Sequence, residues 1–312
     1  MIVQILILLL GLTLVVFGAD WLVDGASAMA RRSGLSEFVI GLTIVGMGTS
    51  APEMVVSFIG AFDGNADIAL GNVIGSNIFN TLLILGLTAM ILPIGITGGN
   101  KKMDIPVNIL VTAIFLGIGF LTGGISRIGG AVLLAIFAVY MFMSFRAGKK
   151  DGPAAGEDIK SLKLHWAVLM IIGGLAALVL GGRMFVNGAT AIAQGLGVSD
   201  KFIAITILAG GTSMPELATC VAAAAKKKGQ LALGNIIGSN LFNILLILGG
   251  SALIHPLSFV DITYVDAAVL MLSAIFIWTA CHVGKKNSID RLDGAIYLIL
   301  WAAYMAWLIV NL

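Results

Sequence analysis

The chain repeats itself once, and every pair of matching blocks is separated by the same number of residues. The matching blocks are GLSEFVIGLTIVGMGTSAPE (34–53) and GVSDKFIAITILAGGTSMPE (197–216), GNVIGSNIFN (71–80) and GNIIGSNLFN (234–243), and GADWLVDGASAMA (18–30) and GGRMFVNGATAIA (181–193). The offset is 163 residues in all three cases. Three blocks in one register predict a chain built from two structurally equivalent halves.

The composition places these halves in a membrane. Charged residues make up 11% of the 312, against roughly 25% in soluble domains, and the mean hydropathy is +1.06. Apolar runs recur that are long enough to cross a hydrocarbon core ~30 Å thick. The sequence therefore predicts an all-α integral membrane protein of about ten transmembrane helices. The expected spans are 3–30, 37–61, 67–92, 105–122, 126–146, 165–195, 202–225, 230–253, 262–283 and 292–311.

Five spans in each half predict that the second half enters the membrane from the opposite side, as an inverted-topology repeat. With the N-terminus outside, fifteen of the 18 lysines and arginines fall on the cytoplasmic side, as the positive-inside rule requires. We expect a first membrane repeat at 1–146, a short polar cytoplasmic linker at 147–163 and a second membrane repeat at 164–312. The expected location is the cell (plasma or inner) membrane, and the long first and sixth spans should be tilted.

Other features limit the possible functions. The N-terminus lacks the basic lead-in of a cleaved signal peptide, so we expect the first span to be retained. Cys220 and Cys281 predict neither a disulfide framework nor a metal site. No basic patch with interleaved aromatic residues indicates a nucleic-acid partner. No nucleophile paired with a base indicates an enzyme, and nothing indicates a cofactor or an obligate protein partner.

Two acidic residues, Glu53 and Glu216, occupy matching positions in the middle of apolar spans. An ionised carboxylate at that depth costs at least ~2.5–3.5 kcal/mol unless it faces protein, water or a cation. Their equivalence predicts one shared site where the repeats meet, although a buried structural pair is the alternative. Each follows Gly-Thr-Ser-x-Pro, and Pro52 and Pro215 should break helices 2 and 7 because proline clashes with the preceding turn.

The broken helices and their neighbours offer only oxygen ligands. The breaks leave carbonyl oxygens beside the hydroxyls of Thr49, Ser50, Thr212 and Ser213, and the second block adds Ser76, Asn77 and Asn80 with Ser239, Asn240 and Asn243. Such ligands suit Ca²⁺ and Na⁺ rather than zinc or copper. Asn77 and Asn240 we expect to hydrogen-bond the broken helices instead of binding ions. Two ionised glutamates would be neutralised by one Ca²⁺ or two Na⁺, which favours exchange over leak.

The paired GTSAPE (48–53) and GTSMPE (211–216), with the two GN(V/I)IGSN(I/L)FN blocks, resemble the alpha-repeats of the cation/calcium antiporters, above all the prokaryotic sodium/calcium exchanger branch. The resemblance covers the whole chain. It implies electrogenic exchange of about three Na⁺ for one Ca²⁺ by alternating access, in which helices 1 and 6 slide against the rest. The transported ions and the lipid bilayer are the partners that it implies.

The resemblance also implies four cation sites in a diamond at the centre of helices 2, 3, 7 and 8. Glu53 and Glu216 would bridge these sites. The remaining implied ligands are the Thr49 and Thr212 carbonyls for calcium, Ser213, Ser76 and the Ala209 carbonyl for an outer sodium ion, Ser50, Ser239 and the Gly46 carbonyl for an inner one, and Asn80 and Asn243 in the middle. Relatives that depend on potassium usually carry Asp at both middle positions, so two asparagines argue against that dependence.

The sequence leaves alternatives open for the function and for several charged residues. A proton/cation antiporter is the alternative to Na⁺/Ca²⁺ exchange, and a cation channel is a further one. Asp20 and Asp24 lie on one face of helix 1 and either line a cation path or serve a structural role. Asp63 and Asp67 are interpreted as part of a solvated loop rather than of a cation vestibule, and Arg183 has no assigned role.

Overall fold

The computed structural model describes residues 2–64, 66–151, 162–196, 209–260, 262–283 and 287–311. The first half contains α1 (Ile2–Ser33), α2 (Glu37–Ile40), η1 (Gly41–Val45), α3 (Gly46–Thr49), α4 (Ala51–Phe62), α5 (Ala66–Ile78), η2 (Phe79–Leu85), α6 (Gly86–Ile91), β1 (Ile94–Gly95), η3 (Asn100–Asp104), α7 (Ile105–Thr122), β2 (Gly124–Ile125) and α8 (Arg127–Asp151). The second half contains α9 (Leu164–Gly195), α11 (Ala209–Gly211), α12 (Met214–Ala225), α13 (Gly229–Phe242), η5 (Asn243–Leu248), α14 (Gly249–Ile254), β3 (Leu257–Ser258), α15 (Tyr264–His282), β4 (Ser288–Ile289) and α16 (Arg291–Asn311).

These elements confirm the predicted all-α membrane architecture. Within the described residues, eight helices are long and apolar enough to cross a membrane, or nine when the bent segment Glu37–Phe62 is counted as one span. The predicted span 202–225 is described only from Ala209 onward, so its first half lies outside the described residues. Helix α8 continues to Asp151, five residues beyond the predicted end of its span. Lysine is a good helix former, which suits this extension through Lys149 and Lys150.

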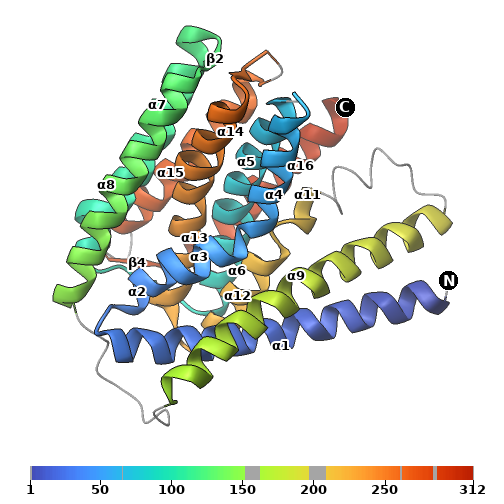
Figure 1. Ribbon diagram of the computed structural model, residues 1–312, viewed down its shortest axis with the longest axis vertical. Coiled ribbons are helices and arrows are strands. Elements are labelled where there is room, and N and C mark those ends of the chain that lie inside the picture. The colour runs from blue at the N-terminus through green and yellow to red at the C-terminus, as the bar shows by residue number, and fades with distance from the viewer. Residues whose placement is uncertain are drawn as a thin grey trace.

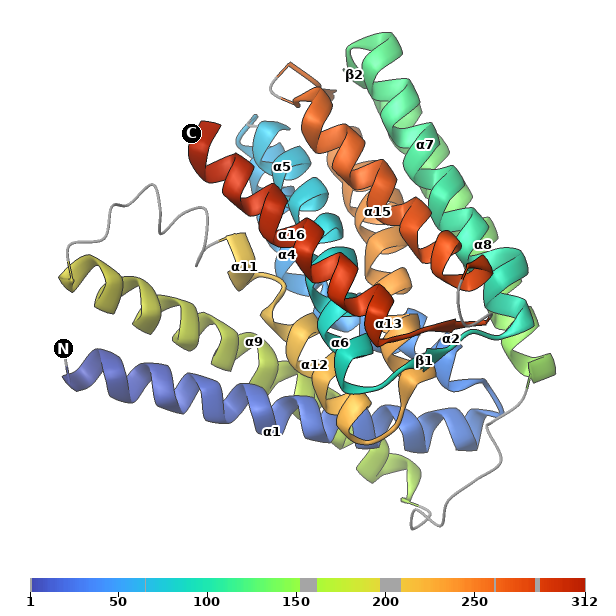
Figure 2. The same ribbon diagram turned by 180° about the vertical axis from the view of Figure 1, so that it is seen from behind.

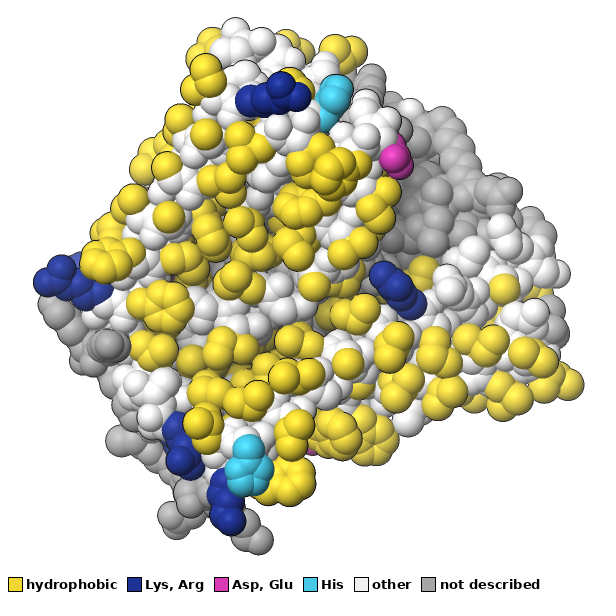
Figure 3. Space-filling view, viewed as in Figure 1, with side chains coloured by type: hydrophobic (Ala, Val, Ile, Leu, Met, Phe, Trp, Pro, Cys, Tyr) yellow, Lys and Arg dark blue, Asp and Glu magenta, His cyan; other side chains and the backbone are white. Residues whose placement is uncertain are grey.

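The outer surface is apolar, as a lipid-facing surface must be. Hydrophobic side chains are spread across the described part of the face in Figure 3, with basic side chains in only a few places on it. Helix α1 alone exposes Leu6, Leu9, Leu10 and Phe17 by half or more of their surface. A patch of this extent would be a liability in water, and it identifies the chain as a multi-pass membrane protein.

The centre of the bundle is formed by the two copies of the second repeated block. In α13, every residue from Leu231 to Phe242 is buried. Two π-helical segments, η2 and η5, continue α5 and α13, and they begin at Phe79 and Asn243. A π-helical turn widens the helix locally and is common at functional sites. The widened turns therefore lie where Asn80 and Asn243 enter the core.

Helices α1 and α9, of 32 residues each, lie together across one end of the bundle at a steep angle to the other long helices (Figure 1 and Figure 2). Glycines spaced seven residues apart line their contact in both helices, at 11, 18 and 25 and at 174, 181 and 188. A Cβ atom on Gly18 would lie 2.8 Å from the carbonyl oxygen of Gly174, and one on Gly174 would lie 2.7 Å from that of Gly18. Small residues permit this backbone contact, so α1 and α9 form one packed unit.

Two short antiparallel strand pairs tie the halves together. Strand β1 pairs with β4 through Ile94 and Ile289, and β2 pairs with β3 through Gly124 and Ser258. Each pair therefore joins one strand from each repeat. The loops of the two repeats are interleaved at both positions.

Candidate cation-binding site

Both repeats are broken at the predicted position. Ser50 leaves the helical region at φ −80° and ψ 8°, and the flanking segments Glu37–Thr49 and Ala51–Phe62 are bent by 49°. Ser213 has nearly the same backbone angles, φ −87° and ψ 8°, between α11 and α12. Pro52 and Pro215 occupy the first turn of the new helix, where the missing N–H costs no hydrogen bond.

The two breaks bring both glutamates to one place. Glu53 and Glu216 are each 1% exposed. The Ser50 hydroxyl donates to Glu216 Oε1 over 2.8 Å, and the Ser213 hydroxyl donates to Glu53 Oε1 over 3.1 Å. Each glutamate is therefore held by the serine at the break of the other repeat. This crossed arrangement places one carboxylate from each half at the repeat interface.

The central helices add a second serine to each carboxylate. Ser76 on α5 donates to Glu53 Oε1, and Ser239 on α13 donates to Glu216 Oε1, each over 3.4 Å. Ser239 also lies 3.3 Å from the carbonyl oxygen of Gly46. Both hydroxyl groups thus lie against the glutamate of their own repeat, at equivalent positions.

Four asparagines link the central helices to each other. Asn80 Nδ2 donates to Asn240 Oδ1 over 3.2 Å, and Asn243 Nδ2 donates to Asn77 Oδ1 over 2.9 Å. Asn77 Nδ2 also donates to the backbone carbonyl of Asn240 over 3.1 Å. Asn77 and Asn240 are hydrogen-bonded as expected, but the expectation that they hold the broken helices is wrong. Because α5 and α13 pack against each other at the centre, the four asparagine side chains bond across that contact and not to the broken helices.

The site contains four buried oxygen atoms that accept no hydrogen bond from the residues that the structure describes. They are Glu53 Oε2, Glu216 Oε2, Asn80 Oδ1 and Asn243 Oδ1, and all four residues are at most 1% exposed. A buried acceptor without a donor costs about 1–3 kcal/mol, and an ionised one costs more. Four such oxygens, two of them from carboxylates, match the ligand chemistry of a hard cation.

The remaining predicted residues surround this centre. Thr49 is fully buried, and its hydroxyl donates to Asn235 Oδ1 over 3.2 Å. The Gly46 carbonyl already accepts from the Ser50 amide over 3.1 Å as well as from Ser239. Thr212 lies at the second break and borders a cavity, and Ala209 begins α11 just before that break.

Two asparagines of the site were not predicted. Asn72 Nδ2 donates to the backbone carbonyl of Glu53 over 3.1 Å and to the Ser57 hydroxyl over 3.0 Å. Asn235, its counterpart in the second repeat, accepts from Thr49 and donates to Cys220 Sγ over 3.2 Å. The available signal was their place in both copies of the second block, directly after its first glycine.

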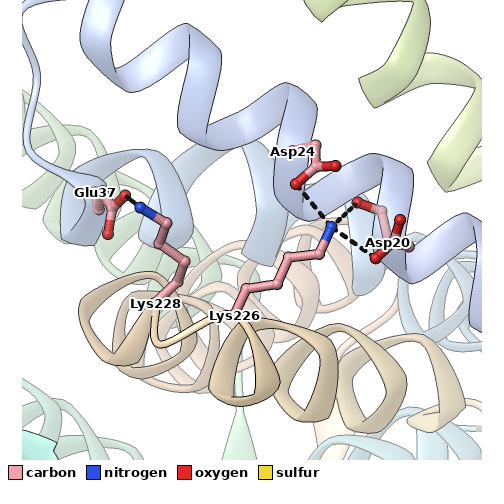
Figure 4. Close-up of polar contacts among 5 residues, drawn as sticks. All are labelled: Asp20, Asp24, Glu37, Lys226 and Lys228. Carbon is pink, nitrogen blue, oxygen red and sulfur yellow. Dashed lines mark hydrogen bonds and ion pairs between the residues drawn. The ribbon is translucent and has the colours of Figure 1, made fainter. Parts of the chain in front are cut away.

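The regions beside the two breaks differ in how tightly they are packed. A cavity of about 230 Å³ lies between α4, α9 and α12 and is bordered by Pro52, Arg183, Thr212 and Pro215. At the matching positions of the other repeat, Val23 and Thr49 are fully buried, whereas their counterparts Val186 and Thr212 are partly exposed. Lys226 bridges Asp20 and Asp24 beside these residues, and Lys228 pairs with Glu37 nearby (Figure 4).

Comparison with known proteins identifies the family. A sequence model described as "Sodium/calcium exchanger protein" matches residues 3–146 and 166–310. The chain belongs to the sodium/calcium exchanger family. Within that family it is 32% identical to the sodium/calcium exchanger MaX1 of Methanosarcina acetivorans over 342 residues, covering 97% of both chains. It is 34% identical to the inner membrane protein YrbG of Escherichia coli, covering 97% of this chain and 96% of YrbG.

Solved structures agree with the family. Structures of the sodium-calcium exchanger NCX_Mj, soaked with Na⁺ and Sr²⁺ or with Na⁺ and Ca²⁺, align with a TM-score of 0.86 at 35% identity and cover 98% of both chains. The predicted membership in the prokaryotic sodium/calcium exchanger branch is thus confirmed. The family is one of transporters rather than enzymes, and Na⁺ and Ca²⁺ are the ions that it transports.

Proposed function

We propose that this chain exchanges Na⁺ for Ca²⁺ across the membrane by alternating access, at a centre built on Glu53 and Glu216. The observation that carries the proposal is the set of four buried oxygens that have no donor among the described residues, two from carboxylates and two from amides. One Ca²⁺ or two Na⁺ would neutralise the two carboxylates. An empty centre would leave two buried like charges, so it resists rearrangement, whereas a loaded centre does not.

The ligand roles follow the two-fold arrangement. Glu53 and Glu216 bridge the ions, and the carbonyls of Thr49 and Thr212 complete the Ca²⁺ site at the two breaks. The outer Na⁺ takes Ser213, Ser76 and the Ala209 carbonyl, and the inner Na⁺ takes Ser50, Ser239 and the Gly46 carbonyl. Asn80 and Asn243 supply amide oxygens in the middle. The hydroxyls that now donate to Oε1 atoms would turn their lone pairs to an ion when it enters.

The proposal includes an orientation and a coupling ratio. The N-terminus lies outside, the segment 147–163 is a cytoplasmic linker between membrane repeats 1–146 and 164–312, and the protein resides in the plasma or inner membrane. Three Na⁺ move against one Ca²⁺, so one net charge crosses per cycle. Each such charge is worth about 2.3 kcal/mol per 100 mV of membrane potential.

The decisive experiment measures ⁴⁵Ca²⁺ uptake into proteoliposomes loaded with Na⁺ and diluted into Na⁺-free medium. We expect uptake with internal Na⁺ and none with internal Li⁺ or K⁺. Uptake driven by a proton gradient with no Na⁺ on either side would instead establish a proton/cation antiporter. Calcium current without a counter-ion would establish a channel.

The coupling ratio is measured in the same vesicles under a valinomycin-clamped potential. With three Na⁺ per Ca²⁺, an interior-negative potential shifts the equilibrium Ca²⁺ distribution, because each cycle moves charge. With two Na⁺ per Ca²⁺ the distribution would not respond to potential.

A further inference from the structure

A formed ion pair joins the packed unit of α1 and α9 to α12. Lys226 Nζ lies 2.6 Å from Asp20 Oδ1 and 2.7 Å from Asp24 Oδ1, and it also donates to the backbone carbonyl of Asp20 over 3.2 Å (Figure 4). Lys226 is the C-cap of α12, the helix whose first turn carries Glu216. One short helix thus connects a site carboxylate to a contact that holds α1 in place.

The repeat places a charge-reversed copy of this contact in the other half. At the offset of 163 residues, Lys226 corresponds to Asp63, Asp20 to Arg183 and Asp24 to Asn187. Asp63 is the C-cap of α4, as Lys226 is of α12. Within the described part of the chain, neither Asp63 nor Arg183 takes part in an ion pair. The first pair is therefore formed and its counterpart is not.

Arg183 and Asp63 each lie where a charge without an opposite partner is unfavourable. Arg183 borders the cavity next to Thr212, so under the proposed function it puts a positive charge beside the space through which cations would enter. Asp63 lies at the C-terminal end of α4, where the helix dipole is negative and repels a carboxylate. An ion pair between Arg183 and Asp63 in another conformation would offset both unfavourable placements.

The geometry gives the direction of the required movement. Arg183 borders the same cavity as Val55 and Val56, and Asp63 lies seven to eight residues further along α4, or about 10–12 Å. A movement of α9 relative to α4 toward the Asp63 end, on the scale of one to two helical turns of ~5.4 Å each, would bring the guanidinium within reach of Asp63. Because α1 is packed against α9 through its glycines, the same movement would carry Asp20 away from Lys226.

We propose that Arg183 and Asp63 form the outer counterpart of the Lys226–Asp20/Asp24 contact, and that the two ion pairs form alternately as the site opens to one side and then the other. This proposal rests on the alternating access of the proposed function. It assigns the balance between the two access states to five charged side chains outside the ion site. The Lys226 pair stabilises the conformation described here, and the Arg183 pair stabilises the opposite one.

Matched cysteine reporters test this without any measurement of transport. Val186 borders the open cavity, whereas Val23, its counterpart in α1, is 0% exposed. In a background with Cys220→Ala and Cys281→Ala, maleimide labelling in detergent should be fast at Val186→Cys and slow at Val23→Cys. The labelling rate at position 23 then reports the population open on the Lys226 side.

The two ion pairs should move that rate in opposite directions. Lys226→Gln should raise labelling of Val23→Cys by about 1.5- to 5-fold, the range measured for exposed ion pairs. Arg183→Gln or Asp63→Asn should lower it by a similar factor. The exchange Asp63→Arg with Arg183→Asp should restore the starting rate, since it re-forms the pair with reversed sign. Lys102→Gln, at an exposed lysine, serves as the control and should leave the rate unchanged.

The proposal is overturned if Arg183→Gln and Asp63→Asn leave labelling at position 23 unchanged, or if the exchanged pair behaves as the sum of its single changes. Its fate is separate from that of the proposed function. Opposed shifts in the labelling rate, in a protein that fails to exchange Na⁺ for Ca²⁺, would support the alternating ion pairs and contradict the proposed transported ions. Normal Na⁺/Ca²⁺ exchange without opposed shifts in the labelling rate would support the proposed function and overturn the alternating ion pairs.

Discussion

Glu53→Gln removes one of the two charges at the centre while keeping the shape of the side chain. The amide oxygen can still accept from Ser213 and Ser76, as Glu53 Oε1 does now. With no ion bound, the variant buries one carboxylate instead of two, so its fold should be at least as stable as the original. The change therefore isolates the electrostatic contribution to ion binding.

The size of the effect follows from the loss of a buried charge partner. Breaking such a pair costs ~3–5 kcal/mol, which corresponds to a loss of roughly 150- to 5,000-fold in Ca²⁺ affinity. Coulomb energy scales with the charge of the ion, so a single Na⁺ should lose about half as much free energy, roughly 10- to 70-fold in affinity. The variant should therefore bind Na⁺ in relative preference to Ca²⁺.

Isothermal titration in detergent measures both affinities, and thermal unfolding gives an independent check. Ca²⁺ at 100 times its dissociation constant should stabilise the unmodified protein by ~2.7 kcal/mol, and this gain should vanish in Glu53→Gln. Asp104→Asn is the matched control. Asp104 is a buried carboxylate outside the site, which accepts from Tyr140 over 2.8 Å and from Asn100 over 3.1 Å. Unchanged Ca²⁺ affinity in Glu53→Gln, or equal losses in both variants, would refute the reasoning.

Three further changes test separate parts of the structure. Asn243→Asp adds a third carboxylate where an amide oxygen now has no donor, so divalent affinity should rise and become more dependent on pH; identical titrations at pH 6 and 8 would contradict this. Gly18→Val forces a side chain against the Gly174 carbonyl and should destabilise the fold by about 1–3 kcal/mol, seen as a lower unfolding temperature. Asn72→Ala removes the donor to the Glu53 carbonyl. Losing this hydrogen bond should cost ~1 kcal/mol or more of Ca²⁺ binding free energy and so weaken Ca²⁺ binding about 5- to 10-fold. Unchanged affinity in ⁴⁵Ca²⁺ binding would show that Asn72 is not part of the site.

Much of the fold could be read from periodic features of the chain. Apolar runs of span length predict helices because lipid leaves backbone groups no partner but their own segment. The breaks at Ser50 and Ser213 followed from one proline two residues later, a local steric effect. The π-helical segments η2 and η5 were not predicted, because their widening is set by packing around Asn80 and Asn243.

The site was predicted in its residue types but not in its connections. Asn77 and Asn240 are an example, since the sequence assigned their hydrogen bonds to the broken helices. In the structure, one bond joins them to each other and the rest join them to three further residues of the central helices, Asn80, Thr81 and Asn243. Asn72 and Asn235 were missed because an asparagine in a helix carries no sign of its partner. Lys226 likewise gave no indication that it would reach Asp20 and Asp24 on a helix some 200 positions earlier in the chain.

The sequence by itself determined that the chain has two equivalent halves, that each spans the membrane as helices, and that each contributes one carboxylate beside a broken helix. These are consequences of local composition and of a duplicated pattern, which need no knowledge of distant contacts. Only the tertiary structure decided that the serine at each break holds the opposite glutamate, and that a cavity borders the break at Thr212 whereas Lys226 bridges two aspartates in the other repeat. Such contacts join residues about 160 or more apart, and they arise from how the inverted halves pack, which no local pattern specifies.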